Sequence, residues 1–243
     1  MITIKKSAKK GLISIVIPVL GTKEPINETL KMIPYKEIEK AGYKTEVVIA
    51  WTPYPPGSKE KLKIKDKHAR IITQKKRGYG NAYLAGFKAA KGDIIITFDA
   101  DKTYPAEDIP RLIRILNEKN LDFLNTNRLV KYEKGAFSRI NLFGNHIFSF
   151  MTKFLLGVKF QDSQSGMWVF RKKILKKLGL KQTGMDFSTE IKIRAYENVK
   201  CGEEIIFYRA RDTIPTLNWF RDGKRVMKYI LKEFFDKIFK RKR

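Results

Sequence analysis

The chain has 243 residues, of which 43% are hydrophobic, so its composition supports a packed core and excludes an intrinsically disordered protein. The 51 Lys and Arg against 25 Asp and Glu give a formal net charge of +26, which predicts a polyanionic partner: nucleic acid, an anionic membrane or a phosphorylated substrate. Cys201 is the only cysteine, so an intramolecular disulfide is excluded and a reducing cytoplasm is expected.

The first half of the chain alternates apolar, β-branched runs with stretches of helical spacing. The runs predict strands at residues 12–18, 45–50, 69–73 and 93–98. The stretches between them predict helices at residues 27–41 and 79–91. Strands that alternate with helices in this way indicate an α/β protein, with a mostly parallel sheet flanked by helices.

The pattern changes beyond about residue 130. An amphipathic helical stretch at residues 137–158 is followed by predicted strands at 167–170 and 204–208, with a helix at 187–196 between them, and the chain ends in a helical segment. The sequence contains no internal repeat and no low-complexity linker. One compact domain over residues 1–243 is therefore the simplest prediction.

Two aspartates follow the most apolar of the predicted strands. Asp99 comes directly after residues 93–98, and Asp101 follows Ala100. Ligands of α/β sheets bind at the carboxyl ends of strands. Two carboxylates so close repel each other unless a cation lies beside them, and a hard divalent ion shared with a diphosphate solves this problem. The alternative is that one aspartate caps a loop while the other is solvated.

Two further segments are candidates for ligand binding. Residues 75–80 place Arg77, Gly78 and Gly80 before a predicted helix, whose backbone N–H groups could bind an anion. Their spacing matches neither a dinucleotide fingerprint nor a P-loop. Residues 161–166, Gln-Asp-Ser-Gln-Ser-Gly, form a polar cluster before a strand, which is typical of an active-site loop or of a turn bonded to its own backbone.

Taken together, five segments resemble the family 2 glycosyltransferases of GT-A fold, and among them the dolichyl-phosphate sugar synthases and their archaeal relatives. The segments are residues 15–18, 77–82, 92–105, 162–166 and 218–223. The resemblance implies a GT-A domain in which residues up to about 130 bind a nucleotide sugar and residues 131–217 form the acceptor half. Residues 218–243 would form a basic amphipathic helix.

The resemblance also implies a reaction. Enzymes of this kind transfer a sugar with inversion from a GDP- or UDP-linked donor, often to a polyprenyl phosphate, using Mg²⁺ or Mn²⁺. A phosphate dianion needs no strong general base, whereas a saccharide hydroxyl, the alternative acceptor, needs a carboxylate to take its proton. Asp186 and Glu190 are the candidates for that base, and Asp186 could equally be a helix N-cap.

The implied site residues are grouped by role. The metal ligands are Asp99 and Asp101. The catalytic residues are Asp101, Asp186, Glu190 and Arg211. The donor is expected to contact Pro18, Trp51, Arg77, Gly78, Asp99, Ala100 and Asp101. The loop for the acceptor and its phosphate comprises Asp162, Gln164, Ser165, Gly166 and Arg221.

The chain departs from the family pattern in three places. Trp51 and Thr52 stand where the family has an aspartate pair for base and ribose, so the base is expected to stack on Trp51 and its identity stays open. Thr103 replaces a glutamine that often ligates the metal. Residues 211–216 keep the family's arginine but lack its phosphate-binding lysine, for which Arg221 or Lys224 would substitute.

The terminal segment predicts an amphipathic helix with two apolar stripes. One stripe contains Val226, Ile230, Phe234 and Ile238, and beside it run Met227, Leu231, Phe235 and Phe239. Ten Lys and Arg against three Asp and Glu in residues 221–243 suit adsorption to an anionic bilayer, while docking on the domain is the alternative. Residues 137–158 repeat the pattern. No segment reaches the roughly 18 apolar residues of a spanning helix, so we expect a peripheral protein on the cytoplasmic face of a membrane.

Two other classes of function compete with this one. The charge of +26 favours a nucleic-acid-binding module, but the sequence has no zinc-finger, helix-turn-helix or RNP-type pattern, so a nucleic-acid partner is not expected. A sugar nucleotidyltransferase also uses an acidic metal pair, but it releases pyrophosphate instead of a nucleoside diphosphate.

Overall fold

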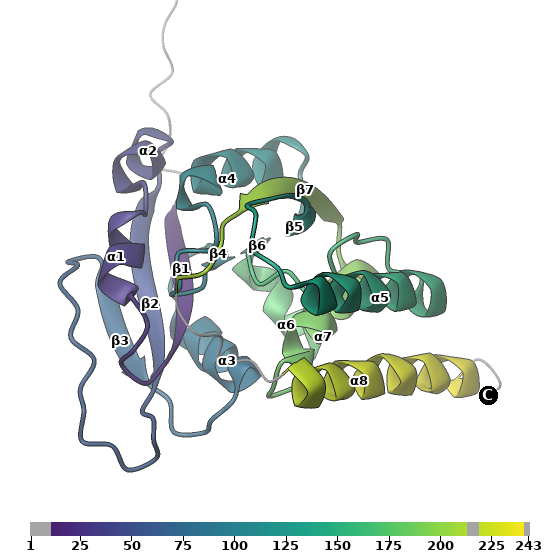
Figure 1. Cartoon of the computed structure of the whole chain (residues 1–243). Coiled ribbons are helices and arrows are strands. Elements are labelled where there is room, and N and C mark those ends of the chain that lie inside the picture. Colours follow the sequence, from purple (N-terminus) through teal and green to yellow (C-terminus); the bar gives the residue numbers. More distant parts are fainter. Residues whose placement is uncertain (1–10, 213–218, 241–243) are drawn as a thin grey trace, which may run out of the picture.

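The structure of the protein is a computed structural model, described here for residues 11–212 and 219–240 (Figure 1). Within these residues a seven-stranded sheet has the order β3-β2-β1-β4-β6-β5-β7. Its strands are β1 (Leu12–Leu20), β2 (Lys44–Thr52), β3 (Ala69–Thr73), β4 (Ile94–Thr97), β5 (Phe123–Tyr132), β6 (Trp168–Arg171) and β7 (Cys201–Tyr208). Only β6 runs antiparallel to its neighbours among the described strands, which confirms the predicted mixed, mostly parallel sheet.

Helices cover both faces of the sheet (Figure 1). The helices are α1 (Ile26–Lys31), α2 (Tyr35–Lys40), α3 (Tyr79–Ala89), α4 (Ile109–Glu118), α5 (Arg139–Leu156), α6 (Leu175–Leu178), α7 (Asp186–Asn198) and α8 (Trp219–Lys240), with 3₁₀ turns at Ala106–Asp108 and Lys172–Ile174. Helices α1, α2 and α4 lie on one face, and α3 and α7 on the other. Helices α5 and α8 lie side by side and project beyond the edge of the sheet.

Two hydrophobic cores enclose the sheet. Because successive side chains of a strand point to opposite faces, β1 places Ile15 and Ile17 in the core under α1, α2 and α4, and Val16 in the core under α3 and α7. All three side chains are fully buried. The continuous apolar runs read from the sequence are therefore strands covered on both faces, as parallel strands usually are.

The single helix predicted at residues 27–41 is wrong. The segment forms two short helices, α1 and α2, with Pro34 immediately before α2. Proline lacks the N–H needed inside a helix, and it disfavours helical geometry at the preceding residue, Ile33. The chain therefore turns between Met32 and Pro34, which the apolar spacing alone did not reveal.

Helix α8 docks on the domain through the first of its two predicted stripes. Val226 and Ile230 are buried in the core shared with α7. Ion pairs reinforce this contact: Arg194 Nη2 lies 2.6 Å from Glu233 Oε1, and Lys237 Nζ lies 2.5 Å from a carboxylate oxygen of α7. The docked interpretation is thus correct for this face. No helix in the part of the chain that the structure describes is long and apolar enough to cross a membrane.

Candidate functional site

The two predicted metal ligands lie at the carboxyl end of β4, a central strand of the sheet. Asp99 is partly exposed, and its Oδ1 lies 3.4 Å from the hydroxyl of Tyr83, at the limit of hydrogen bonding. Burial on its inner side, reinforced by the nearby Asp101 carboxylate, raises the pKa of Asp99 from 3.8 to about 7. Arg211 and Arg128 oppose this shift without cancelling it, so an additional positive charge would favour the ionised carboxylate.

Asp101 is almost fully buried, and both of its carboxylate oxygens have partners. Oδ1 accepts hydrogen bonds from the backbone N–H of Thr103 at 3.1 Å and from its hydroxyl at 2.6 Å. Oδ2 forms an ion pair with the guanidinium of Arg211. Lys102, between Asp101 and Thr103, has a φ of +65°, a strained conformation for a residue with a side chain. The resulting turn brings Thr103 back to Asp101, so that the two residues can form these hydrogen bonds.

A short segment after β7, residues 209–212, is fastened along this loop. The backbone N–H of Arg209 donates to the carbonyl of Thr103 at 2.9 Å. The carboxylate of Asp212 lies 2.8 Å from Lys102 Nζ. Arg211 lies between these contacts, which explains how a residue more than a hundred positions away reaches Asp101. The predicted catalytic residues Asp101 and Arg211 are therefore brought together, while residues 213–216 of the predicted motif lie outside the described part.

A third carboxylate, that of Glu24, approaches this pair and was missed by the sequence analysis. Its Oε2 is buried without a hydrogen-bond partner. Burial, followed by the charge of Asp101, raises the pKa of Glu24, and Arg211 opposes the shift. Its position in the loop after β1, at the same edge of the sheet as Asp99, is the signal that could have identified it. No three acidic, histidine or cysteine side chains converge closely enough to form a ready metal cluster among the described residues.

The polar loop at residues 161–166 is held by a buried ion pair. Asp162 is fully buried and accepts hydrogen bonds from Arg128 Nε at 2.7 Å, Arg128 Nη2 at 2.9 Å and the backbone N–H of Arg128 at 3.0 Å. The guanidinium lies over the rings of Phe137 and Tyr208. Arg128 was not predicted as a site residue, because it carries no recognisable motif and the sequence analysis predicted no strand where β5 forms.

The rest of this loop is tied to its surroundings in a similar way. Gln164 Nε2 donates to the hydroxyl of Thr189 at 3.0 Å, and Ser165 Oγ lies 2.7 Å from Thr126 Oγ1. The N–H of Gly166 donates to the hydroxyl of Tyr104 at 2.5 Å. The loop is thus a rigid support whose last residue adjoins Asp99, because a Cβ placed on Gly166 would be 3.3 Å from Asp99 Oδ2.

The glycine-rich segment before α3 packs against the start of α7. Gly78 has a φ of +146°, and a Cβ there would lie 2.2 Å from the carbonyl oxygen of Thr183. A side chain at this position is therefore excluded on two grounds. The guanidinium of Arg77 lies 4.6 Å from the ring centre of Tyr54. This geometry accounts for Gly78 by packing, and anion binding at this helix start stays a prediction.

The two candidate bases, Asp186 and Glu190, both have partners inside the protein. Asp186 is the first residue of α7, not its N-cap, which is Met185. Its Oδ1 forms an ion pair with Arg225 Nε at 2.9 Å, too bent to count as a hydrogen bond. Glu190 accepts hydrogen bonds from the backbone N–H groups of residues 181 and 182 at 2.8–3.0 Å. Burial raises the pKa of Glu190.

The remaining residues that were predicted to contact the donor are buried or half-buried. Trp51 is 9% exposed, lies in the core under α1 and donates its indole N–H to the carbonyl of Gly21 at 2.7 Å. Pro18 is half-buried at the end of β1. The carbonyl of Ala100 accepts a hydrogen bond from Thr29 in α1 at 2.7 Å. Base stacking on Trp51 stays a prediction that its small exposed area restricts.

Arg221, predicted to bind phosphate together with the polar loop, belongs to helix α8. It lies at the start of α8, with its side chain 68% exposed, and forms an ion pair with Asp222. About one helical turn further on, Arg225 contacts Asp186 at the start of α7 and Thr183 just before it. Helix α8 therefore contacts, through Arg225, the segment that packs on Gly78. The sequence analysis did not predict Arg225 as a site residue.

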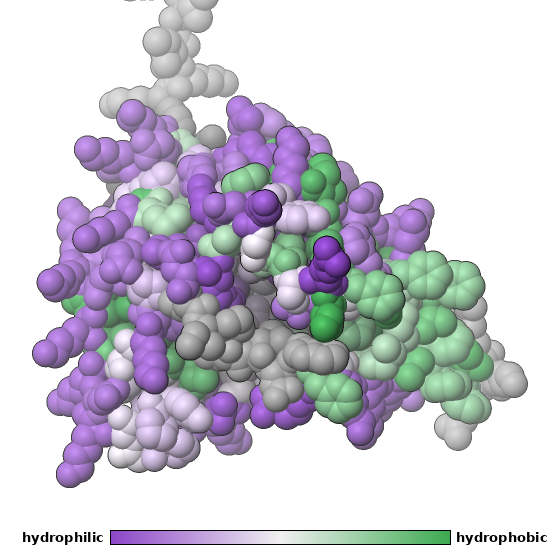
Figure 2. Space-filling view, in the orientation of Figure 1, coloured by the Kyte–Doolittle hydropathy of each residue, from purple (hydrophilic) through white to green (hydrophobic). Residues whose placement is uncertain are grey.

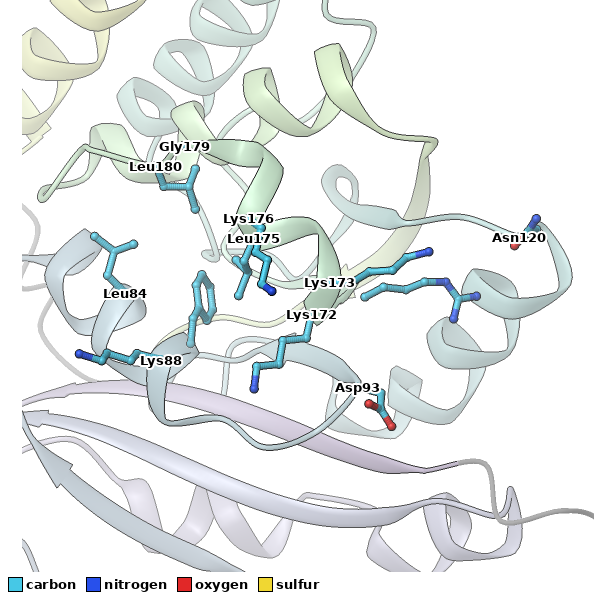
Figure 3. Close-up of a pocket in the computed structure, with 12 residues that line it drawn as sticks. Leu84, Lys88, Asp93, Asn120, Lys172, Lys173, Leu175, Lys176, Gly179 and Leu180 are labelled. Atoms are coloured by element: carbon cyan, nitrogen blue, oxygen red, sulfur yellow. The ribbon is translucent and has the colours of Figure 1, made fainter.

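A large open cavity lies at the opposite edge of the sheet from Asp99. Its volume is about 1140 Å³, and Asp93, just before β4, marks its place at the amino ends of the central strands. Figure 3 shows Lys172, Lys173 and Lys176 on its rim. Two of them already have partners, because Lys172 donates to a backbone carbonyl at 2.5 Å and Lys173 lies 3.3 Å from an aspartate. This cavity is separate from the candidate site.

Comparison with known proteins identifies the group to which the chain is similar. The sequence profile of Glycosyl transferase family 2 matches residues 14–179. A dolichyl-phosphate hexose transferase of Haloferax volcanii is 32% identical over 166 residues, 68% of this chain and 71% of that protein. The low-salt glycan biosynthesis hexosyltransferase Agl6 of the same organism is 31% identical over 67% of this chain and 40% of its own length.

Solved structures agree with the fold. Glucosyl-3-phosphoglycerate synthase from Mycobacterium tuberculosis, crystallised with Mn²⁺, UDP and phosphoglyceric acid, superposes with a TM-score of 0.69 at 16% identity, covering 93% of this chain and 79% of that one. At this identity the match concerns the fold alone. It agrees with the mixed sheet and flanking helices described above, and the resemblance noted in the sequence is confirmed by the profile match.

Proposed function

Because the chain belongs to glycosyl transferase family 2, we propose that it transfers a hexose from a nucleoside diphosphate to a polyprenyl phosphate, with inversion and with a divalent metal. The observation that carries the proposal is the Asp99 and Asp101 pair at the end of β4, with Arg211 fastened over it. Relatives named for transfer to dolichyl phosphate and undecaprenyl phosphate support the acceptor class.

The residues of the site fit a hard divalent cation. Asp99 and Asp101 offer oxygen ligands only, which suits Mg²⁺ or Mn²⁺. Burial and the neighbouring Asp101 raise the pKa of Asp99, so a further positive charge would favour its ionised form, and Arg211 supplies part of that charge at Asp101. A bound cation would be held by these two carboxylates and would neutralise charge on the departing diphosphate. The likeness to a synthase crystallised with Mn²⁺ and UDP is consistent with this cofactor.

Arg211 would serve the leaving group as well. Its side chain is 26% exposed, and the charge of Asp101 raises its pKa against the effect of burial, so it stays cationic. A guanidinium beside the metal ligands can bind the phosphate oxygens of the donor in two-point contacts. We therefore assign Arg211 to stabilisation of the nucleoside diphosphate as the bond to the sugar breaks.

The state of the candidate bases favours a phosphate acceptor over a hydroxyl. Asp186 is paired with Arg225, and Glu190 is bonded to two backbone N–H groups. Each carboxylate is thus already engaged by a partner inside the protein. An acceptor phosphate attacks the anomeric carbon through an oxygen that is already ionised, so the new bond forms, the nucleoside diphosphate departs and no proton needs to be removed.

A membrane-facing surface would bring a lipid-linked acceptor to the site. Helix α5 exposes Ile140, Phe143, Phe150 and Phe154, the last by 75%, and α8 exposes Leu231, Phe235 and Phe239. Figure 2 shows these hydrophobic side chains gathered over α5, against a largely hydrophilic remainder of that view. Apolar side chains on a strongly basic protein suit adsorption to an anionic bilayer. We propose peripheral binding here, on the cytoplasmic face.

The reaction is tested with purified protein, UDP- and GDP-linked hexoses, and a polyprenyl phosphate in detergent. We expect a lipid-linked hexose and a free nucleoside diphosphate, with turnover that requires Mg²⁺ or Mn²⁺. Asp101→Asn should lower kcat by about 100-fold or more. The matched control is Asp108→Asn, which removes an acid paired with Arg111 at the start of α4 and should retain activity.

Each part of this proposal has its own contrary result. Full turnover with a chelator present, or in the Asp101→Asn variant, would refute the metal site. Transfer to a saccharide but not to polyprenyl phosphate would refute the acceptor. Release of pyrophosphate in place of a nucleoside diphosphate would indicate a nucleotidyltransferase.

Membrane binding is tested by sedimentation with vesicles of phosphatidylcholine and phosphatidylglycerol. The double variant Phe143→Ser, Phe154→Ser should bind the vesicles more weakly than the unaltered chain. Phe207→Ser is the control, because Phe207 is also exposed but belongs to β7 and not to α5 or α8. Equal sedimentation of all three proteins would exclude α5 as the membrane-binding surface.

A further inference from the structure

A lysine is buried in α7 without an acidic partner. Lys192 is 1% exposed, and its Nζ donates to the carbonyl of Ser165 at 2.6 Å, the carbonyl of Ser188 at 3.1 Å and the hydroxyl of Ser188 at 2.9 Å. It also lies 4.8 Å from the ring centre of Trp168. Among the described residues no carboxylate lies within ion-pair distance of Nζ. Lysine is rarely buried in this way, because desolvation of the amine costs free energy.

Lys192 is one of three donors that bind the same carbonyl oxygen, that of Ser165. The oxygen of Ser165 receives Lys192 Nζ, the indole N–H of Trp168 at 2.7 Å and the hydroxyl of Ser188 at 3.1 Å. A carbonyl oxygen has two lone pairs, so its acceptor capacity is fully used. Since the peptide group is planar, fixing this carbonyl also fixes the direction of the N–H of Gly166.

That N–H points toward the candidate site. It donates to the hydroxyl of Tyr104 at 2.5 Å. A Cβ on Gly166 would lie 2.9 Å from the hydroxyl of Tyr79, 3.1 Å from that of Tyr104 and 3.3 Å from Asp99 Oδ2. The carbonyl of Gly166 accepts from Thr97 Oγ1 in β4 at 2.7 Å. The Asp99 carboxylate therefore lies next to the peptide group between Ser165 and Gly166.

We propose that Lys192 is a positioning residue that fixes the Ser165–Gly166 peptide and, through it, the place of the Asp99 carboxylate in the donor site. This inference rests on the function proposed above, because it gives Asp99 a part in binding the donor. Lys192 itself touches neither substrate nor metal. Its action passes through one peptide group, whose glycine adjoins the Asp99 carboxylate.

Stability alone does not explain a lysine at this position. Trp168 and Ser188 already satisfy the Ser165 carbonyl, and a methionine would fill a similar volume next to Trp168 without a desolvated amine. Replacement of buried charges by apolar residues of similar volume is often neutral or stabilising. Burial lowers the pKa of Lys192, although Asp162 opposes the shift. A residue held at this cost is consistent with a role in function.

The test uses Lys192→Met in the full chain, with Arg194→Met as the matched control. Arg194 is on the same helix, but its partners are Glu197 and Glu233. Hydrogen exchange of residues 162–168, measured without ligand, should become about tenfold faster in Lys192→Met and stay unchanged in the control. The dissociation constant of UDP or GDP in the presence of Mn²⁺ should rise about tenfold, again only in Lys192→Met.

Two milder variants keep the test informative if Lys192→Met does not fold. Trp168→Phe and Ser188→Ala each remove one of the other donors to the same carbonyl. Both should speed exchange of residues 162–168 and weaken Mn²⁺-dependent nucleotide binding by a smaller factor. The effects of Trp168→Phe and Ser188→Ala should also be non-additive in the double variant, because both act on one peptide.

Unchanged exchange in these variants would overturn the proposal, and so would faster exchange with unchanged nucleotide affinity. Failure of the proposed function is detected separately. If Asp101→Ala leaves Mn²⁺-dependent nucleotide binding intact, the donor site itself is refuted. The exchange experiment does not depend on that outcome, since it contains neither metal nor nucleotide.

Discussion

Removal of the Arg128 side chain should destabilise the fold by about 3–5 kcal/mol, the range for breaking a buried ion pair from one side. Arg128→Met removes two hydrogen bonds to Asp162, at 2.7 and 2.9 Å, and such bonds to a charged group contribute about 1.5–3 kcal/mol each. It also removes the guanidinium from the rings of Phe137 and Tyr208, a contact of about 0.5–2 kcal/mol. Asp162 would keep its backbone donors but lose its counter-charge.

Urea unfolding at neutral pH measures this loss, and a double-mutant cycle shows its origin. Asp162→Asn combined with Arg128→Met removes the unpaired charge, so the double variant should be more stable than Arg128→Met alone. A cost below about 1 kcal/mol for Arg128→Met would refute the reasoning. It would mean that Lys192, the next cation near Asp162, or water compensates the carboxylate.

The ion pair between Asp162 and Arg128 also predicts how the stability of the protein depends on pH. Burial alone would raise the pKa of Asp162, but Arg128 overrides it and lowers the pKa below its usual value of 3.8. A carboxyl with a lowered pKa in the folded state stabilises the protein above the unfolded value, and this contribution is lost as the pH falls through the folded value. Acid titration below pH 3.8 should therefore destabilise the unaltered chain more steeply than the double variant.

Three further predictions follow from packing and burial. Gly78→Ala should destabilise the protein by about 1–3 kcal/mol or more, because its φ of +146° and the carbonyl of Thr183 exclude a side chain; equal urea midpoints would contradict this. Trp51→Phe should cost about 1 kcal/mol through loss of the hydrogen bond to Gly21, and weaker nucleotide binding in calorimetry would add support for base stacking. Burial raises the pKa of Cys201 to about 12, so its reaction with a thiol reagent at pH 8 should be far slower in the native state than in urea; equal rates would contradict burial.

The parts of the site that could be predicted from sequence are those whose chemistry is local. Asp99 and Asp101 directly follow an apolar strand, so their place at the sheet edge follows from the strand itself. The partner of Asp162 is 34 positions away, and nothing in the sequence around Arg128 indicates that it turns inward. Glu24 was missed for the same reason. Glu24 comes close to Asp101 only because β1 and β4 are neighbours in the sheet.

The spacing of apolar residues also failed to reveal where one of the predicted helices is interrupted. It identified an apolar stretch over residues 27–41 but not the break at Pro34, because the apolar positions of α1 and α2 happen to keep helical spacing across it. The buried lysine is a sharper case. In sequence, Lys192 looks like a solvated position of an amphipathic helix. Its burial arises from Trp168 and the Ser165 carbonyl, which reach α7 from other elements of the fold.

Helix α8 shows why the choice between a docked and a membrane-bound face needs the structure. Its two stripes have the same period and nearly the same hydrophobicity, so the sequence cannot rank them. The ion pairs of Glu233 with Arg194 and of Lys237 with Glu197 turn Val226 and Ile230 inward and leave Phe235 exposed. Because α8 also packs on α5, docking of one stripe determines where the other is presented. The position of the proposed membrane surface therefore depends on how α8 docks on α7, through the buried stripe and the ion pairs that reinforce it.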